Sequence, residues 1–178
     1  KRLWRKRNPK ELRSVHVSPR GEFIIVEDED NRFLFYNSEG QLVRKHRFET
    51  TKAFRYVVAE RTYTAFANSH GRLIVLDSSG KQIWTKRVCR RLVDMHSLGD
   101  HLGVLDRSGV TLVLDLYGDL ARHFGKVGGL RYLTKPRGEE PILYNAEGEV
   151  LTAFRPPKSR VAWRYHCPSE IKALAADL

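Results

Sequence analysis

The sequence predicts an all-β fold built from small four-stranded antiparallel sheets, and two observations support this. First, Trp4, Trp84 and Trp163 lie about 80 residues apart, which indicates a repeat of about 40 residues. Second, short runs rich in β-branched and aromatic residues, such as 23–28 and 72–77, recur between turn sequences. Together these features predict strands joined by hairpins in a repeated unit.

The turn sequences fall into two sets that follow the same period. Each begins with Asn or Asp, which can accept hydrogen bonds from its own following backbone, and ends with Gly or once Asn, which tolerates positive φ. We therefore expect type I turns followed by a left-handed residue. The first set is 28–31, 68–71, 106–109 and 145–148, and the second is 37–40, 77–80 and 115–118. The fourth unit departs from the second set with Arg155-Pro156-Pro157-Lys158.

Each unit thus contains four strands, of which the last is a basic segment, with a Trp in two of the four units. The units span approximately 12–49, 54–89, 91–127 and 130–166. A sheet of about 40 residues cannot bury both of its faces by itself. Stacked around an axis, such sheets bury one another, so the units are expected to be the blades of a β-propeller.

The chain ends on the same phrase with which it begins. LWRKRNPKEL at 3–12 and AWRYHCPSEI at 162–171 share Trp, Arg, Pro and Glu at matching places. Both are interpreted as the junction between a last strand and the next first strand. We therefore expect residues 1–178 to be a single segment, with a partial blade at each end, of a seven- or eight-bladed propeller whose other blades lie on the same polypeptide. Residues 169–178 also fit a helix, but the junction favours a strand.

Two motifs resemble known repeat families. LDSSGKQIW at 76–84 resembles the Asp-x-x-Gly-Lys-x-x-Trp signature of quinoprotein-like (PQQ-type) repeats. SPRGEFIIVED at 18–28 is similar to the start of a WD40-like blade. The resemblance implies the propeller superfamily, and it leaves a fragment of a quinoprotein-like enzyme as one alternative. Those enzymes hold their cofactor with adjacent cysteines and calcium-binding acids, whereas Cys89 and Cys167 are far apart in this sequence.

Basic residues concentrate in the predicted outermost strands and their flanks. The net charge is +11, and five windows (1–10, 40–49, 80–91, 118–127 and 157–166) hold most of the Lys and Arg. Lys and Arg on edge strands discourage pairing with other chains. The alternative is a basic rim that binds a partner or a polyanion. The residues predicted to bind there are Arg5, Lys6, Arg7, Arg44, Lys45, Arg47, Lys86, Arg87, Arg90, Arg91, Arg160 and Arg164.

A second recurrence places one basic residue near the start of each predicted first strand. These residues are Arg13, Arg55, Arg131 and Lys172. First strands line the central channel of a propeller, so these side chains could form a ring for an anionic ligand. The alternative is that each pairs with an acid on a neighbouring blade.

Catalytic chemistry is not indicated by the motifs. No nucleophile elbow, phosphate-binding loop or zinc-ligand spacing is present, so we expect no catalytic residues, no metal and no cofactor. No apolar run is long enough for a membrane span, and two cysteines favour a reducing compartment, the cytoplasm. We predict a non-catalytic scaffold that binds a macromolecular partner, most simply a protein, through blade-end loops and the basic rim. The alternative is a module that binds nucleic acid or another polyanion.

Overall fold

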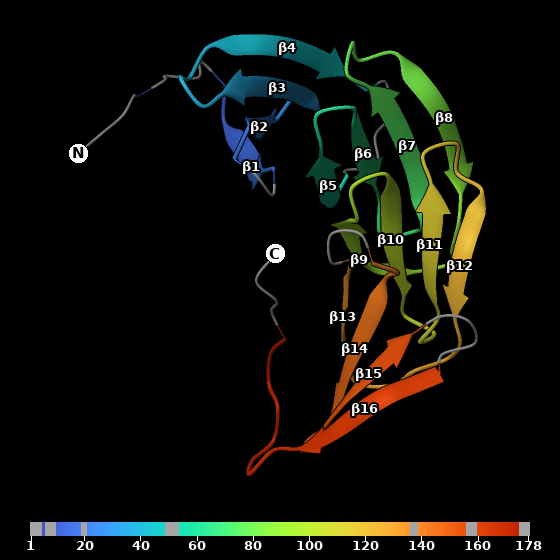
Figure 1. Cartoon of the computed structure of the whole chain (residues 1–178). Helices are drawn as coiled ribbons and strands as arrows, with labels where there is room; N and C mark the ends of the chain where they lie inside the picture. The colour runs from blue at the N-terminus through green and yellow to red at the C-terminus, as the bar shows by residue number, and fades with distance from the viewer. Residues whose placement is uncertain are drawn as a thin grey trace. The chain divides into compact units, whose positions relative to one another are not determined.

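The computed structural model describes residues 5, 10–18, 21–48, 54–135, 139–155 and 160–174. Within these residues, sixteen strands form four separate four-stranded antiparallel sheets (Figure 1). Each sheet is a simple meander in which strands that follow one another in sequence lie side by side. The prediction of an all-β fold made of small antiparallel sheets is therefore confirmed.

The sheets follow one another along the chain, and we number them 1 to 4. Sheet 1 contains β1 (Leu12–Val17), β2 (Phe23–Asp28), β3 (Arg32–Asn37) and β4 (Leu42–Arg47). Sheet 2 contains β5 (Tyr56–Ala59), β6 (Tyr63–Ala67), β7 (Arg72–Asp77) and β8 (Gln82–Arg87). Sheet 3 contains β9 (Leu92–Ser97), β10 (His101–Asp106), β11 (Thr111–Asp115) and β12 (Leu120–Phe124). Sheet 4 contains β13 (Leu130–Thr134), β14 (Ile142–Glu147), β15 (Val150–Arg155) and β16 (Arg160–His166).

The turns have the chemistry that the sequence predicts. In the β7–β8 hairpin, Asp77 Oδ1 accepts hydrogen bonds from the backbone N–H groups of Ser79 and Lys81, each at 2.9 Å. Gly80 then takes a left-handed φ of 88°, and Asn31 takes one of 56° at the corresponding place in the β2–β3 turn. At Gly71, which is also left-handed, an added Cβ would collide with the backbone carbonyl of Cys89, so this position requires glycine. The predicted second turn of the fourth unit, 155–158, lies largely outside the described residues.

The repeat also appears in the hydrogen bonds that fix the linkers between sheets. After each outermost strand, a backbone N–H donates to the carbonyl of the turn between the second and third strands of the same sheet. These bonds are Phe48 to Asn31, Val88 to Gly71, Val127 to Gly109 and Cys167 to Glu149. They give a common register for all four sheets.

The sequence phrase at 162–171 has the structural role of such a linker. Ile171 N donates to Gly148 O at 2.9 Å, just as Leu92 N donates to Ser69 O at 3.0 Å where sheet 3 begins. Residues 169–174 form neither a strand nor a helix. For 169–174, therefore, neither the predicted strand nor the alternative helix is found. Residues 175–178 lie outside the described residues.

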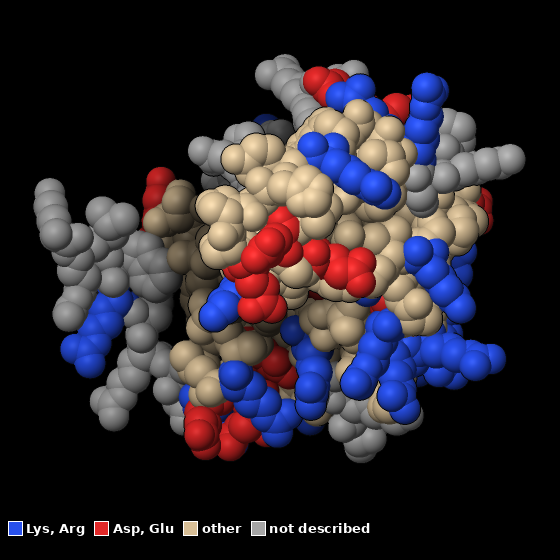
Figure 2. All heavy atoms as spheres, turned by 90° about the horizontal axis from the view of Figure 1, so that it is seen from below, with Lys and Arg blue, Asp and Glu red and all other residues tan. Residues whose placement is uncertain are grey.

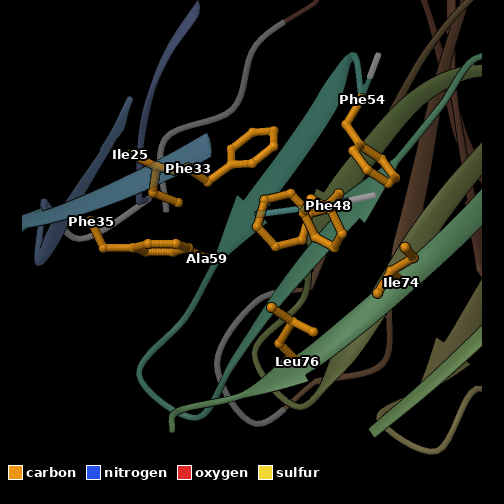
Figure 3. Close-up of a cluster of buried hydrophobic side chains, with 9 residues drawn as sticks. Ile25, Phe33, Phe35, Phe48, Phe54, Ala59, Ile74 and Leu76 are labelled. Carbon is orange, nitrogen blue, oxygen red and sulfur yellow. The ribbon is translucent and has the colours of Figure 1, made fainter. Parts of the chain in front are cut away.

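The chain divides into two compact units, residues 1–68 with 72–86 and residues 69–71 with 87–178. The core of the first unit joins sheets 1 and 2 through five phenylalanines, which we call the phenylalanine cluster. Its members are Phe33, Phe35, Phe48, Phe54 and Phe66. Figure 3 shows the labelled rings among Ile25, Ile74 and Leu76. The Phe66 ring meets Phe33 edge-on at 4.7 Å and Phe48 at 4.8 Å between centroids, so the aromatic contacts tie the two sheets together.

The second unit buries a mainly aliphatic core between sheets 3 and 4. Leu105 and Val113 of sheet 3 pack with Leu133 and Leu143 of sheet 4, and Phe124 is the one fully buried ring in this cluster. Strand alternation explains the pairing, because Leu133 and Leu143 are direct cross-strand partners and therefore point to the same face. Among the residues that the structure describes, none belongs to a helix long and apolar enough to cross a lipid bilayer.

Candidate functional site

The predicted basic rim is exposed over most of its described members. Lys6 and Arg7 lie outside the described residues, and Arg44 is half-buried. The exposed members are Arg5, Lys45, Arg47, Lys86, Arg87, Arg90, Arg91, Arg160 and Arg164. Figure 2 shows basic side chains standing out from the surface in groups, with fewer acidic side chains among them. The described members of the rim therefore differ in exposure, with Arg44 half-buried and the others exposed.

Arg44 is engaged within the first unit. Its guanidinium lies 3.9 Å from the centroid of the Phe35 ring and donates to the carbonyls of Asp77 and Ser78, at 3.0 and 2.9 Å. A third bond, of 2.8 Å, reaches Thr64 Oγ1. Burial lowers the pKa of Arg44, which Asp77 opposes. This arginine joins sheet 1 to sheet 2.

A different arrangement holds the linker between β8 and β9. The carboxylate of Asp106 is buried, and its Oδ2 accepts hydrogen bonds from the backbone N–H groups of Arg90 and Arg91, at 3.2 and 3.0 Å. Its Oδ1 accepts from Ser108 N at 2.7 Å. Burial acts to raise the pKa of Asp106, but the hydrogen bonds from Ser108, Arg91 and Cys89 outweigh it and hold the pKa at about 2. The group is therefore a carboxylate at neutral pH.

This buried carboxylate fixes two neighbouring segments while leaving their arginine side chains outside. Arg107 N donates to Arg91 O at 2.8 Å, so the β10–β11 turn lies against the linker. Arg87 Nε donates to the carbonyls of His70 and Cys89, at 3.1 and 3.2 Å. All four arginine side chains are exposed, and no ion pair joins any of them to a carboxylate of the described residues. We call Arg87, Arg90, Arg91 and Arg107 the arginine cluster.

In the equivalent turn of sheet 1, the carboxylate forms an ion pair with an arginine side chain. Asp28 holds the same place in the β2–β3 turn as Asp106 in the β10–β11 turn. Its Oδ2 accepts from Arg32 Nε at 2.8 Å and lies 2.7 Å from Arg32 Nη2. Burial tends to raise the pKa of Asp28, and the bonds to Arg32 and Asp30 more than offset it, so the pKa is lowered. Arg32 is thus neutralised within its own sheet, whereas the arginine cluster is not.

Sequence reasoning missed Asp106 and Arg107 as parts of a site. Asp106 was assigned only as a turn residue, and Arg107 lies outside the predicted outermost strands. The repeat contains the signal that would have found them. In sheet 1 the turn between the second and third strands is bonded to the residue just before the first strand, Glu29 N to Glu11 O, and the same relation in sheet 3 joins Arg107 N to Arg91 O.

The residues predicted to line a channel have different surroundings. Arg13 Nη1 donates to Asn31 Oδ1 at 2.9 Å, and Arg55 and Lys172 are exposed. Arg131 is half-buried and donates to Asp106 O at 2.5 Å and to Val110 O at 3.1 Å, so it joins sheet 4 to sheet 3. Its pKa is lowered by burial and raised by Asp106. Because Arg13 and Arg55 belong to the first unit and the other two to the second, a ring of four stays a prediction.

Arg164 lines a pocket in the second unit. The pocket has a volume of about 710 Å³ and lies between the linker after β12 and the strands of sheet 4. Lys126, Arg164 and Glu147 all line it, so the lining has mixed charge. Asn145 donates its amide to the carbonyls of Gly128 and Leu130 and is occupied by the linker. The pocket lining thus carries both basic and acidic side chains, whereas the arginine cluster is entirely basic.

Two groups of residues have the types needed for nucleophilic chemistry, but their geometry does not supply it. The Ser14 hydroxyl donates to Glu27 Oε2 at 2.8 Å and lies 3.0 Å from His16 Nε2. Because the Ser14 hydroxyl donates its hydrogen bond to Glu27, it can only accept one from His16, which is the reverse of what an activated serine requires. At Cys89, burial, followed by Asp106, raises the thiol pKa to about 12, so the reactive thiolate is scarce at neutral pH.

Metal binding has no arrangement to support it in the part of the chain that the structure describes. There, no group of three or more His, Cys, Asp or Glu side chains is arranged so that it could hold a metal ion. The acidic segment 27–30 is used by the protein itself, since Glu27 is bound by Ser14 and Asp28 by Arg32.

Comparison with known proteins identifies solved structures that have a similar fold. No family model matches the sequence, and no curated protein matches it. Among solved structures, Hsv2 of Kluyveromyces lactis superposes with a TM-score of 0.67 at 10% identity, covering 96% of this chain and 56% of that protein. The C-terminal WD40 domain of Sif2 gives 0.66 at 13% identity over 91% and 48%. BBS1N in complex with ARL6DN gives 0.66 at 15% identity over 91% and 56%.

These similarities cover nearly all of this chain but only about half of each solved structure. At such low identity they establish the fold alone. The four antiparallel meanders and the superpositions agree on a propeller fold. The chain has the fold of part of a β-propeller, and each of its four sheets is one blade.

Proposed function

We propose that this chain is a non-catalytic propeller scaffold that binds an acidic segment of a partner protein through the arginine cluster. The observation that carries the proposal is the arrangement around Asp106. One buried carboxylate holds the backbone of the linker and of the neighbouring turn, and four guanidinium groups face solvent beside it. Guanidinium groups bind carboxylates with paired hydrogen bonds, so the surface suits aspartate and glutamate side chains.

The fold supports one part of this proposal, the role as a protein-interaction module. WD40-like propellers commonly serve as interaction modules, and the structure of BBS1N includes a partner protein, ARL6DN. Fold alone does not assign a function, so the proposal for this chain rests on the local surface.

The composition of the two segments favours an acidic protein over nucleic acid. Single-stranded nucleic acid is bound by a basic groove together with aromatic side chains on which bases stack. Residues 87–91 and 106–110 contain no aromatic residue. Nucleic acid is therefore the second candidate, and the same experiment distinguishes the two.

The test compares two variants with the same change in charge. In the cluster variant, Arg90, Arg91 and Arg107 are changed to Gln. In the control variant, Arg61, Arg122 and Arg155, which pair with Glu22, Glu140 and Glu139, are changed to Gln. Binding of a glutamate-rich peptide is measured by calorimetry at low and at physiological salt.

We expect the cluster variant to bind the peptide roughly tenfold more weakly or worse, since three rim contacts of up to about 1 kcal/mol each are lost. The control variant should stay close to the unchanged protein, and added salt should weaken binding in both. Equal affinity of the two variants would reject the site. Strong binding of RNA with a steep salt dependence, without binding of the peptide, would favour the second candidate.

A further inference from the structure

The pocket of the second unit has one face of sheet 4 as its floor. Leu143 and Phe154 lie on the face that packs against sheet 3. They are cross-strand partners, and so are Asn145 and Thr152, which lie two residues away on the same strands. Because side chains two residues apart in a strand point to the same side, Asn145 and Thr152 share this face. The end of β12 and residues 125–128 of the following linker form the opposite wall.

Two buried polar side chains of this floor have hydrogen-bonding groups that the protein does not use. Asn145 and Thr152 are each only 5% exposed, and both line the pocket. The linker occupies the amide nitrogen of Asn145, which donates to the carbonyls of Gly128 and Leu130. Among the residues that the structure describes, none forms a hydrogen bond with Asn145 Oδ1 or with the Thr152 hydroxyl. Since buried polar groups are normally paired, a ligand with its own donor and acceptor would complete them.

Three charged side chains line the same pocket. Lys126 comes from the linker, Glu147 from the end of β14 and Arg164 from β16. Within the described part of the chain, none of the three forms an ion pair with another of them or with any other residue. A simple anion does not match this lining because Glu147 repels it, and a simple cation does not because Lys126 and Arg164 repel it. A ligand that carries charges of both signs matches all three.

The strand register sets the distance between the charges on the floor. Arg164 is the cross-strand partner of Thr152, whereas Glu147 is the partner of Val150. Arg164 and Glu147 are therefore two strands and two positions apart, which corresponds to a Cα separation of roughly 12 Å. A single amino acid is much shorter than this, whereas two or three linked residues span roughly 7 to 10 Å. With the lengths of the two side chains added, a dipeptide or tripeptide reaches both charges.

We propose that this pocket binds a dipeptide or tripeptide with free ends. Lys126 and Arg164 bind the carboxylate end, and Glu147 binds the ammonium end, through charge-assisted hydrogen bonds. Between the ends, a peptide N–H donates to Asn145 Oδ1 and a peptide carbonyl accepts from the Thr152 hydroxyl. The volume of about 710 Å³ lies in the range of pockets that hold small ligands. The pocket shares no residue with the arginine cluster, so the two proposals stand or fall separately.

Calorimetric titration of the chain with trialanine tests the proposal. Trialanine with free ends should bind saturably, and both N-acetyl-trialanine and trialanine amide should bind roughly tenfold more weakly, because each lacks one charged end. Glu147→Gln should weaken binding of the free peptide by a similar factor and leave the affinity for the acetylated peptide unchanged. Arg164→Gln should weaken binding of the free peptide and leave the affinity for the amide unchanged. A merely structural role of either residue would lower the affinity for all three peptides.

Glu149→Gln and Arg155→Gln are the matched controls, because both side chains are exposed, belong to the same sheet region and lie outside the pocket lining. Both controls should bind trialanine as the unchanged protein does. The blocked peptides are tested on the unchanged protein, so the result does not depend on the folding of any variant. The proposal would be overturned by absence of saturable binding at about 10 mM trialanine. Equal affinity for free and blocked peptides, or equal losses in the control variants, would overturn it as well.

Discussion

The two units of the molecule join their sheets with different chemistry. The first unit uses the phenylalanine cluster and the guanidinium of Arg44, which comes from the outermost strand β4. The second uses a mainly aliphatic core and the guanidinium of Arg131, which comes from the innermost strand β13. Each arginine ends on backbone carbonyls of a hairpin in the neighbouring sheet. A basic residue in this repeat is therefore either part of a junction or part of the surface, and charge alone does not tell which.

The turns of the two units also differ in whether an arginine side chain pairs with the buried aspartate. Asp28 accepts backbone N–H bonds from Asp30 and Arg32 and in addition binds the Arg32 side chain, so the charge of that arginine is neutralised. Asp106 is satisfied by backbone N–H groups, so the side chains of Arg90, Arg91 and Arg107 are available. The aspartate of this turn thus neutralises an arginine side chain in the first unit, at Arg32. In the second unit it leaves the arginine side chains beside it cationic.

The largest effect is expected from the two cores. Phe66→Ala should lower the free energy of unfolding by about 4 kcal/mol, because the ring contacts Phe33 and Phe48 and truncation leaves a cavity. Leu143→Ala in the second unit should cost about 3 kcal/mol, since a smaller apolar group is removed. Urea denaturation followed by fluorescence and circular dichroism measures both. A larger loss for Leu143→Ala would reverse the ranking of the two cores.

The arginines at the junctions come next. Arg44→Met should destabilise the protein by about 2–3 kcal/mol, because it removes three hydrogen bonds and the contact with Phe35. Arg131→Met should cost about 2 kcal/mol through its bonds to sheet 3. Lys45→Met, next to Arg44 on the exposed side of β4, is the control and should change stability by less than about 0.5 kcal/mol. A loss at Lys45 equal to that at Arg44 would show that the contacts of Arg44 are not the cause.

A smaller effect is expected from acid. The pKa of Asp106 is lowered in the folded protein from 3.8 to about 2. Its contribution to stability is therefore complete above pH 4 and is lost as the pH falls from about 4 toward 2. The contribution is at most about 2 kcal/mol. Asp106→Asn should flatten the pH dependence of the unfolding free energy in this range, and an unchanged slope would contradict the role assigned to the carboxylate.

The sequence predicted the strands and turns well because both depend on local patterns. Asx turns with a left-handed last residue recur at Asn31, Gly80 and Gly109, and their chemistry needs only neighbouring residues. The role of Arg44 could not be predicted in this way. In LVRKHR at 42–47, basic residues occupy both faces of the strand, so alternation does not show which of them points inward. That choice depends on the β3–β4 pairing, which places Arg44 opposite Phe35 after a shift in register.

The arginine cluster was predicted only in part for a similar reason. Arg87, Arg90 and Arg91 are visible as a basic run, but Arg107 joins them only through the hydrogen bond of its N–H to Arg91 O. Likewise, Asp106 is an ordinary turn residue in sequence, and its burial beneath the linker is a property of the packed sheets.

The division of arginines between junctions and surface is tested most directly by the affinity of two folded variants for the same glutamate-rich peptide. Arg44→Met should keep the Kd of the unchanged protein although its stability falls. The variant with Gln at 90, 91 and 107 should keep its stability and bind roughly tenfold more weakly or worse. Equal losses of affinity in the two variants, or a loss confined to Arg44→Met, would contradict the account.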